Sequence, residues 1–199
     1  MKDNRTNQIQ LSGALEAAAG LQAGVVRRTH YTFECYGRPV RGRDERGRFA
    51  WSRPLQWSDE FDNAVVTEGL NDSLDKHFKG SSYTAAWYVG ITGSAPGFAA
   101  GDTMASHAGW VEATAYSDGS RRALTLGTVS GGSVSNSASK AAFTINGTAT
   151  IGGAFITTGS ATSGSTGTLY GGGAFTGGDR AVQSGDTLNV TATLTAGSA

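Results

Sequence analysis

A group of basic residues with aromatic residues among them lies between residues 38 and 57 and has the side chains best suited to binding another molecule. Its arginines are Arg38, Arg41, Arg43, Arg46 and Arg48, and its tryptophans are Trp51 and Trp57. Arginine pairs with phosphates and with carboxylates, so the pattern is compatible with nucleic acid and with an acidic protein surface. Asp44 and Glu45 interrupt the group, and the chain has a formal net charge of zero, which favours the protein surface. We therefore expect the five arginines to pair with carboxylates of a protein partner and the two tryptophans to be buried there.

Other polar residues that could take part in chemistry lack a supporting pattern. His107 lies near Asp102 and Glu112, but two carboxylates and one histidine within eleven residues are more typical of a polar loop than of a metal site. The chain lacks a G-x-S-x-G nucleophile motif, and its glycine runs do not continue into a phosphate-binding loop. Cys35 is interpreted as a small buried hydrophobic residue. We expect no catalytic, metal-binding or cofactor-binding residues, and so no enzyme.

The composition predicts a small core. Glycine accounts for 30 of 199 residues and hydrophobic residues for 38%, many of them alanine. Glycine loses much conformational entropy on folding and buries no side chain, so we expect further burial against a partner or against other copies of the chain. No apolar run approaches the length of a membrane span, and the opening residues do not resemble an export signal.

Residues 1–58 are predicted to form an extended basic arm. The first 53 residues contain ten basic and five acidic side chains, a net charge of +5, and show no sustained periodicity. Short strands are possible at "RTHYTFECY", where Tyr31, Phe33 and Cys35 alternate, and around "RFAWS", with "RGRDERGR" as a turn between them. We expect another surface to order the arm.

A helix is predicted over residues 63–79, at the start of a domain spanning 59–199. Val66, Leu70, Leu74 and Phe78 recur at every fourth position, and Gly80 follows where a helix stop is needed. Asp62 or Asn63 is the expected N-terminal cap. Burial of the four apolar side chains should stabilise the domain, so we expect this face of the helix to be packed.

The remainder of the chain has the pattern of β-strands. In "DTLNVTATLTA" apolar and polar residues alternate strictly, as in a strand with one buried face, and "AAWYVGIT" and "HAGWVEATAY" are further candidates. We expect a hairpin between Ala181 and Leu194. Residues 143–151 allow either one long strand or a hairpin turning at Asn146-Gly147, and the even spacing favours the single strand. The predicted fold is mainly β, an antiparallel β-sandwich or jelly roll with one short helix.

Several segments of the β part together resemble a known type of protein. They are "NAVVTEGLNDSLDKHF", "AAWYVGIT", "GDTMASHAGWVEATAY", "VSNSASKAAFTINGTATIGGAFIT" and "TGTLYGGGAFTGGDRAVQSGDTLNVTATLTA". The run is similar to small structural proteins of tailed bacteriophages and prophages, in which a short helix precedes a "WYVGL"-like strand and the chain closes on "GDTLNVTYTL"-like alternation. The resemblance covers roughly residues 63–196. It implies a component of the virion and supplies no catalytic residues.

The expected function is that of a capsid cement or decoration protein that forms a homotrimer, is assembled in the host cytoplasm and lies on the capsid surface. Its partner would be the major capsid protein, with neither nucleic acid nor a membrane involved. Truncation of residues 1–57 is then expected to abolish capsid binding and to leave the β domain folded. Two alternatives remain open: a tail fibre, adaptor or baseplate component, and a carbohydrate-binding module that stacks sugars on Trp87, Tyr88 and Trp110.

Overall fold

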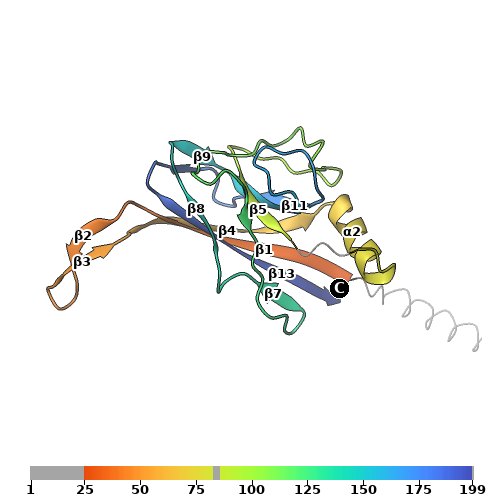
Figure 1. Cartoon of the computed structure of the whole chain (residues 1–199), viewed down its shortest axis with the longest axis horizontal. Helices are drawn as coiled ribbons and strands as arrows, with labels where there is room; N and C mark the ends of the chain where they lie inside the picture. Colours follow the sequence, from red (N-terminus) through yellow and green to blue (C-terminus); the bar gives the residue numbers. More distant parts are fainter. Residues whose placement is uncertain (1–24, 83–85, 199) are drawn as a thin grey trace, which may run out of the picture.

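Three long antiparallel strands form the centre of the fold: β1 (Val25–Tyr36), β4 (Leu55–Val65) and β13 (Thr187–Ser198). The structure, a computed structural model, describes residues 25–82 and 86–198. β1 pairs with β13 along its whole length and with β4 from Thr29 to Tyr36, so it has a neighbour on each side. Figure 1 shows the three strands side by side.

Shorter strands extend this centre into a nine-stranded sheet. They are β5 (Tyr88–Thr92), β6 (Arg122–Ala123), β7 (Ser133–Ser135), β8 (Ala141–Thr144), β10 (Gly153–Thr157) and β11 (Leu169–Ala174). The order is β6-β5-β10-β11-β4-β1-β13-β7, and β8 also pairs with β13. A separate two-stranded sheet joins β9 (Ala149–Ile151) to β12 (Arg180–Val182). All of these pairings are antiparallel, and the prediction of a mainly β fold with one short helix is confirmed.

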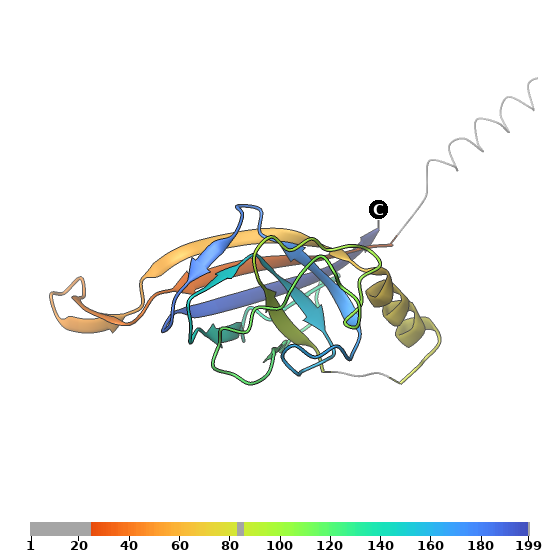
Figure 2. The ribbon, with the colours of Figure 1, turned by 90° about the horizontal axis from the view of Figure 1, so that it is seen from above.

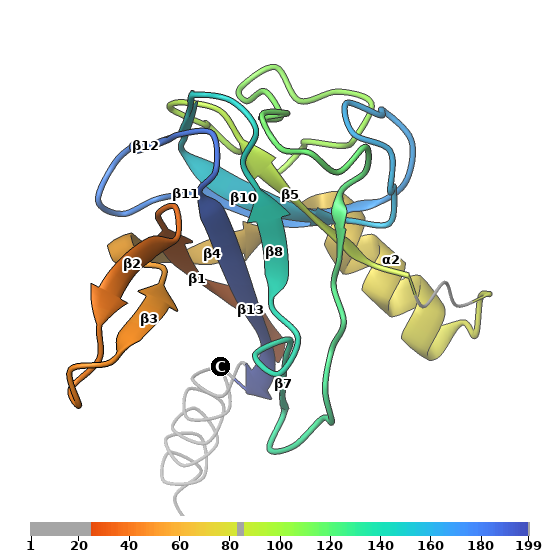
Figure 3. The same ribbon diagram turned by 60° about the vertical axis from the view of Figure 1, so that its left-hand side comes forward.

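The long sheet has two halves that share one core. β11 joins β4 through two residue pairs, and beyond this short junction the strands of one half run across those of the other (Figure 3). Buried residues of β1, β8 and β13 belong to the same apolar cluster as those of β5 and β10. The sheet therefore encloses its core between two layers, as expected for a sandwich.

β1 contributes large side chains to this core. Tyr31, Phe33 and Cys35 alternate inward and are fully buried, as their spacing predicts. The Tyr31 ring stacks on Phe61 with centroids 4.8 Å apart, and the rings of Phe33 and Phe175 pack in a T-shaped arrangement with centroids 4.6 Å apart. Burial of each such side chain stabilises the fold by about 2–3 kcal/mol. β1 is therefore a central structural element.

The central position of β1 differs from the predicted extended arm over residues 1–58. Residues 1–24 lie outside the described residues, but from Val25 onward the segment belongs to the fold: residues 25–36 and 55–58 are paired in the sheet. The possible strand at "RTHYTFECY" is confirmed as β1, but the prediction of an extended arm is wrong for residues 25–36 and 55–58, because the β13 partners of β1 lie more than 100 residues away in the chain and could not be identified from local pattern. Truncation of residues 1–57 would remove β1, and we now expect it to unfold the domain.

The helix is shorter than predicted, and the face that packs against the body is not the predicted one. α2 spans Thr67–Phe78, residues 63–65 belong to β4, and the N-terminal cap is Val66, whose side chain makes no capping hydrogen bond. The exposed fraction rises along the predicted apolar face, from 1% at Val66 through 42% at Leu70 and 53% at Leu74 to 74% at Phe78. Four residues turn an α-helix by roughly 400°. Each step of four residues therefore moves the side chain about 40° around the helix axis, away from the buried position of Val66. The predicted packing of this face is wrong beyond its first residue.

Three strand predictions also need correction. "HAGWVEATAY" forms no strand and has only isolated bridges at Glu112 and Tyr116. The segment 143–151 is neither one strand nor a hairpin, because β8 ends at Thr144 and pairs with β13, whereas β9 begins at Ala149 and pairs with β12. The expected hairpin between Ala181 and Leu194 is absent, since β12 pairs with β9 and β13 pairs with β1. The alternation in β13 is confirmed by its buried Leu188, Val190 and Ala192. Among residues 25–82 and 86–198, no helix is long and apolar enough to cross a membrane.

The buried position of β1 can be tested through Cys35. Its thiol is fully buried, and this burial raises its pKa to about 12, so very little thiolate forms at pH 8. We expect an aromatic disulfide reagent at pH 8 to label the native protein at least about 100-fold more slowly than the guanidinium-unfolded protein, because labelling requires opening of the sheet. Equal labelling rates would contradict the central place of β1.

Candidate functional site

The arginine-rich segment forms a separate β-hairpin that projects from the body. Strands β2 (Val40–Arg43) and β3 (Phe49–Ser52) pair only with each other among the described strands, and all eight of their residues are exposed. Figures 1 and 2 show the hairpin extending from one end of the molecule, whereas α2 lies at the other end. The predicted strand around "RFAWS" is β3 and a turn precedes it, but its partner is β2, whose residues 41–43 lie within the segment predicted as the turn, and not the strand at "RTHYTFECY", which is β1.

One face of the hairpin combines arginine with aromatic side chains. The register pairs Arg41 with Trp51 and Arg43 with Phe49, so these four side chains share a face. The guanidinium carbons of Arg41 and Arg43 lie 4.4 and 4.5 Å from the centroid of the Phe49 ring, within the range of cation–π attraction. We call these four residues the docking face. Trp51 is 71% exposed and Phe49 61%, although both are apolar enough for a core.

The tip of the hairpin is held by Asp44. One of its carboxylate oxygens accepts hydrogen bonds from the backbone N–H groups of Arg46 (3.0 Å) and Arg48 (2.9 Å), and the other accepts one from the Arg48 side chain at 3.1 Å. Gly47 has a φ of +73°, in the left-handed region that glycine adopts without strain. Asp44 therefore orders the turn, and it forms an ion pair with the side chain of Arg48.

The base of the hairpin is fastened to the body by two arginines. Arg38 donates a hydrogen bond from Nε to the carbonyl of Ser184 (2.7 Å), and Arg53 donates one to the carbonyl of Gly185 (3.1 Å). Isolated two-stranded hairpins are marginally stable, so these contacts and the ordered tip help to hold its shape. The segment thus has a defined fold in the single chain, without the partner surface expected to order it.

The structure brings together some of the predicted binding residues and separates others. Arg41, Arg43 and Trp51 share the docking face. Arg46 and Arg48 lie at the tip of the hairpin, whereas Arg38 binds the body at its base. Trp57 lies on β4, where it packs against Phe175 and donates a hydrogen bond to the carbonyl of Ala181 (3.2 Å). Phe49 was not among the predicted anchors. Its alternation with Trp51 is the sequence signal that places both on one face.

The groups considered for metal binding make other contacts. Asp102 accepts hydrogen bonds from the Trp110 indole and the Ala99 backbone, both at 3.0 Å, and His107 stacks on Trp110. Glu112 receives two hydrogen bonds from Arg121, at 2.9 and 2.8 Å. Within the described parts of the chain, no cluster of three or more potential ligands could hold a metal ion. Trp110 is also buried, which removes it as an exposed platform for sugars.

No protein-family model matches the chain, and no curated protein matches it either. The residues and their geometry therefore carry what can be inferred about function.

The Glu112–Arg121 pair gives a stability prediction. The exposed fractions of the two side chains are 5% and 1%, so Glu112→Gln would leave a buried guanidinium without its counter-charge. We expect a loss of about 3–5 kcal/mol in the free energy of unfolding, measured by urea denaturation. The matched control is Asp118→Asn, which breaks the more exposed pair with Arg122 and should cost about 0–1 kcal/mol. Equal losses in the two variants would contradict a structural role for the buried pair.

Proposed function

We propose that this protein is a structural component of a tailed-bacteriophage virion, a capsid cement or decoration protein that binds the major capsid protein through the docking face. The observation that carries the proposal is a projecting hairpin with exposed tryptophan, phenylalanine and arginine side chains on one face. Tryptophan and arginine are enriched among the residues that dominate binding energy at protein interfaces. The resemblance of residues 63–196 to phage structural proteins supports the virion as the setting.

The chemistry of the docking face defines the surface that would receive it. Trp51 and Phe49 need an apolar recess, because their rings stabilise a complex when they leave water. Arg41 and Arg43 need carboxylates around that recess, and their positions over the Phe49 ring keep the guanidinium groups on the same face as the aromatic groups. A partner with an apolar recess rimmed by Asp and Glu therefore fits.

The ordered shape of the hairpin bears on affinity. Binding loses less conformational entropy when the binding element already has its bound shape, and Asp44 at the tip and Arg38 at the base provide that order. The attraction between arginines and coat carboxylates should speed association and weaken as salt screens it. A protein acting in this way stabilises a shell mechanically, since each bound copy covers coat surface and no substrate is converted.

The proposal predicts which side chains matter for binding. In co-sedimentation with purified capsids that lack this protein, Trp51→Ala should weaken binding by about thirtyfold and Arg41→Glu by about tenfold, because both change the docking face. The matched controls are Val129→Ala, which shortens an exposed apolar side chain elsewhere, and Arg122→Glu, which makes the same charge change on the body.

A variant without the hairpin completes this test. Replacing residues 40–52 with Asn-Gly, a favoured two-residue turn, keeps Arg38 and Arg53 and should leave Cys35 protected while binding is lost. Capsid binding that survives this replacement in a folded protein would contradict the proposed role of the hairpin. Sedimentation with purified tails instead of capsids would favour the tail alternative.

A further inference from the structure

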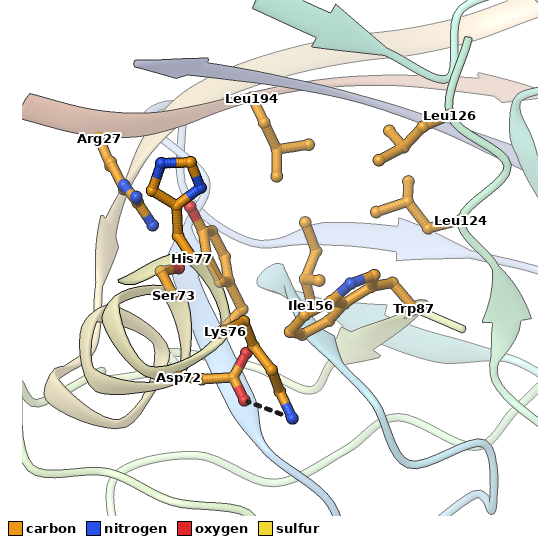
Figure 4. A pocket seen from close by; sticks show the side chains of 11 residues that line it. Arg27, Asp72, Ser73, Lys76, His77, Trp87, Leu124, Leu126, Ile156 and Leu194 are labelled. Carbon is orange, nitrogen blue, oxygen red and sulfur yellow. Dashed lines mark ion pairs between the residues drawn. The ribbon is translucent and has the colours of Figure 1, made fainter. Parts of the chain in front are cut away.

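A hollow of about 380 Å³, the α2 hollow, lies between helix α2 and the sheet (Figure 4). Its volume is in the range of small-molecule binding sites, roughly 300–1,000 Å³. Residues from its different walls are Arg27, Ser73, Trp87, Leu126, Ile156 and Tyr170. The hollow begins where the buried core ends, because Ile156 and Tyr170 line it and also belong to the core cluster.

Helix α2 presents polar side chains to this space. Gly69 lies so close to β11 that a Cβ atom there would be 2.3 Å from the Tyr170 carbonyl oxygen, and this close approach fixes the rotation of the helix about its axis. Asp72, Ser73 and Lys76 then line the hollow, and Asp72 and Lys76 form an ion pair with each other. The helix face that packs on a core is normally apolar. The α2 hollow is therefore suited to hold polar groups as well as apolar ones.

A charged side chain enters the hollow from β1. The inward positions of this strand hold Cys35, Phe33 and Tyr31, then the buried Thr29, and then Arg27, which lines the hollow. Among residues 25–82 and 86–198, no carboxylate forms an ion pair with the Arg27 guanidinium. A guanidinium at an inward position is a strong partner for an anionic group, because it offers several N–H donors in one plane.

The polar and apolar groups gather at different ends of the hollow. Figure 4 shows Arg27 and His77 on one side and Leu124 and Leu126 on the other. Tyr170 belongs to the polar end: burial raises the pKa of its hydroxyl, and the nearby positive charge of Arg27 acts in the opposite direction. The α2 hollow thus has the character of a site for an amphiphilic molecule.

The apolar end leaves large side chains incompletely covered. Trp87 and Leu126 are only partly buried, although both pack against the core cluster. The Trp87 ring meets the Tyr170 ring in a T-shaped arrangement with centroids 5.7 Å apart, which holds the indole at the wall of the hollow. An alkyl chain placed here would remove these apolar surfaces from water and so stabilise a complex.

We propose that the α2 hollow binds a single-chain alkyl carboxylate, with the carboxylate at Arg27 and the chain against Trp87, Leu124 and Leu126. One guanidinium balances one negative charge, which favours a carboxylate over a doubly charged phosphate. The volume suits one alkyl chain of medium length and is too small for a lipid with two long chains. This site is separate from the docking face, which lies at the other end of the molecule (Figure 1).

Titration calorimetry with decanoate tests the ligand class on the full chain. Decanoate should bind one molecule per chain. Octanoate should bind about tenfold more weakly, because it lacks two CH₂ groups that would be buried. Decanol, which has the same chain without the charge, should bind at least about tenfold more weakly than decanoate. No binding of decanoate at millimolar concentration, or equal binding of decanoate and decanol, would overturn the proposal.

Two neighbouring arginines give a matched pair of variants. Arg27→Gln should raise the dissociation constant of decanoate at least about tenfold, because it removes the charge at the polar end. Arg28→Gln makes the same change at the next residue, which is exposed and points to the opposite face of β1, and should leave the affinity unchanged. Slow labelling of Cys35 verifies that both variants are folded. Equal affinities of the two folded variants would contradict the role of Arg27.

A brominated ligand locates the alkyl chain without changing the polar end. The bromine of ω-bromodecanoate quenches the fluorescence of a tryptophan that it contacts. The ligand should quench the wild type and Trp51→Phe, and the quenching should disappear in Trp87→Phe. Trp51 lies on the docking face, so this control also separates the α2 hollow from the proposed capsid contact. Quenching that persists in Trp87→Phe and is lost in Trp51→Phe would rule out the proposed site.

Discussion

The pairing of β1 between β13 and β4 is the constraint on which the other features of this molecule depend. It places Tyr31, Phe33 and Cys35 in the core and fixes the exit of the chain at Tyr36 and its return at Leu55. The intervening residues have no free strand beside them in the sheet centre, so β2 and β3 pair with each other and project. At its far end β4 meets β11 and leads into α2, which fixes the first turn of the helix. One set of strand pairings thus positions both exposed surfaces.

These two surfaces have different physical characters. The docking face joins arginines to aromatic rings, and it is suited to an acidic partner with an apolar recess. On α2, by contrast, the exposed row of Leu70, Leu74 and Phe78 is apolar. A chain with 30 glycines and a modest core exposes large apolar groups at both ends, which is consistent with a protein that completes its burial in an assembly.

Alternation in the sequence predicted two strands correctly. The alternation of Tyr31, Phe33 and Cys35 and the strict alternation after Thr187 both mark strands with one buried face, and the turn around Asp44 is visible in its residue types. Pairing partners were not predictable, because β1 and β13 are joined by contacts between residues such as Phe33 and Val190, which lie far apart in the chain. Without these pairings, the segment that contains β1 was predicted to be part of an extended arm.

The sequence predicted which residues form much of the candidate binding site, but only partly how these residues are arranged. Arg41, Arg43 and Trp51 do share a face, but the sequence alone could not separate them from Arg38, which holds the hairpin base, or from Trp57, which packs on the body. The four-residue spacing predicted that Leu70 and Leu74 are buried on the same helix face as Val66, but both are exposed. The rotation of the helix about its axis depends on the approach of Gly69 to Tyr170, which only the folded chain reveals.

We propose that the docking face contacts the coat protein, and photo-crosslinking from position 51 can test this contact. A photoreactive phenylalanine analogue replaces Trp51 in intact particles, and the crosslinked peptides are identified by mass spectrometry. We expect adducts with the major capsid protein, in a segment that contains Asp or Glu beside apolar residues. Adducts with tail proteins alone, or a side chain at position 51 that reacts with no protein in the particle, would contradict it.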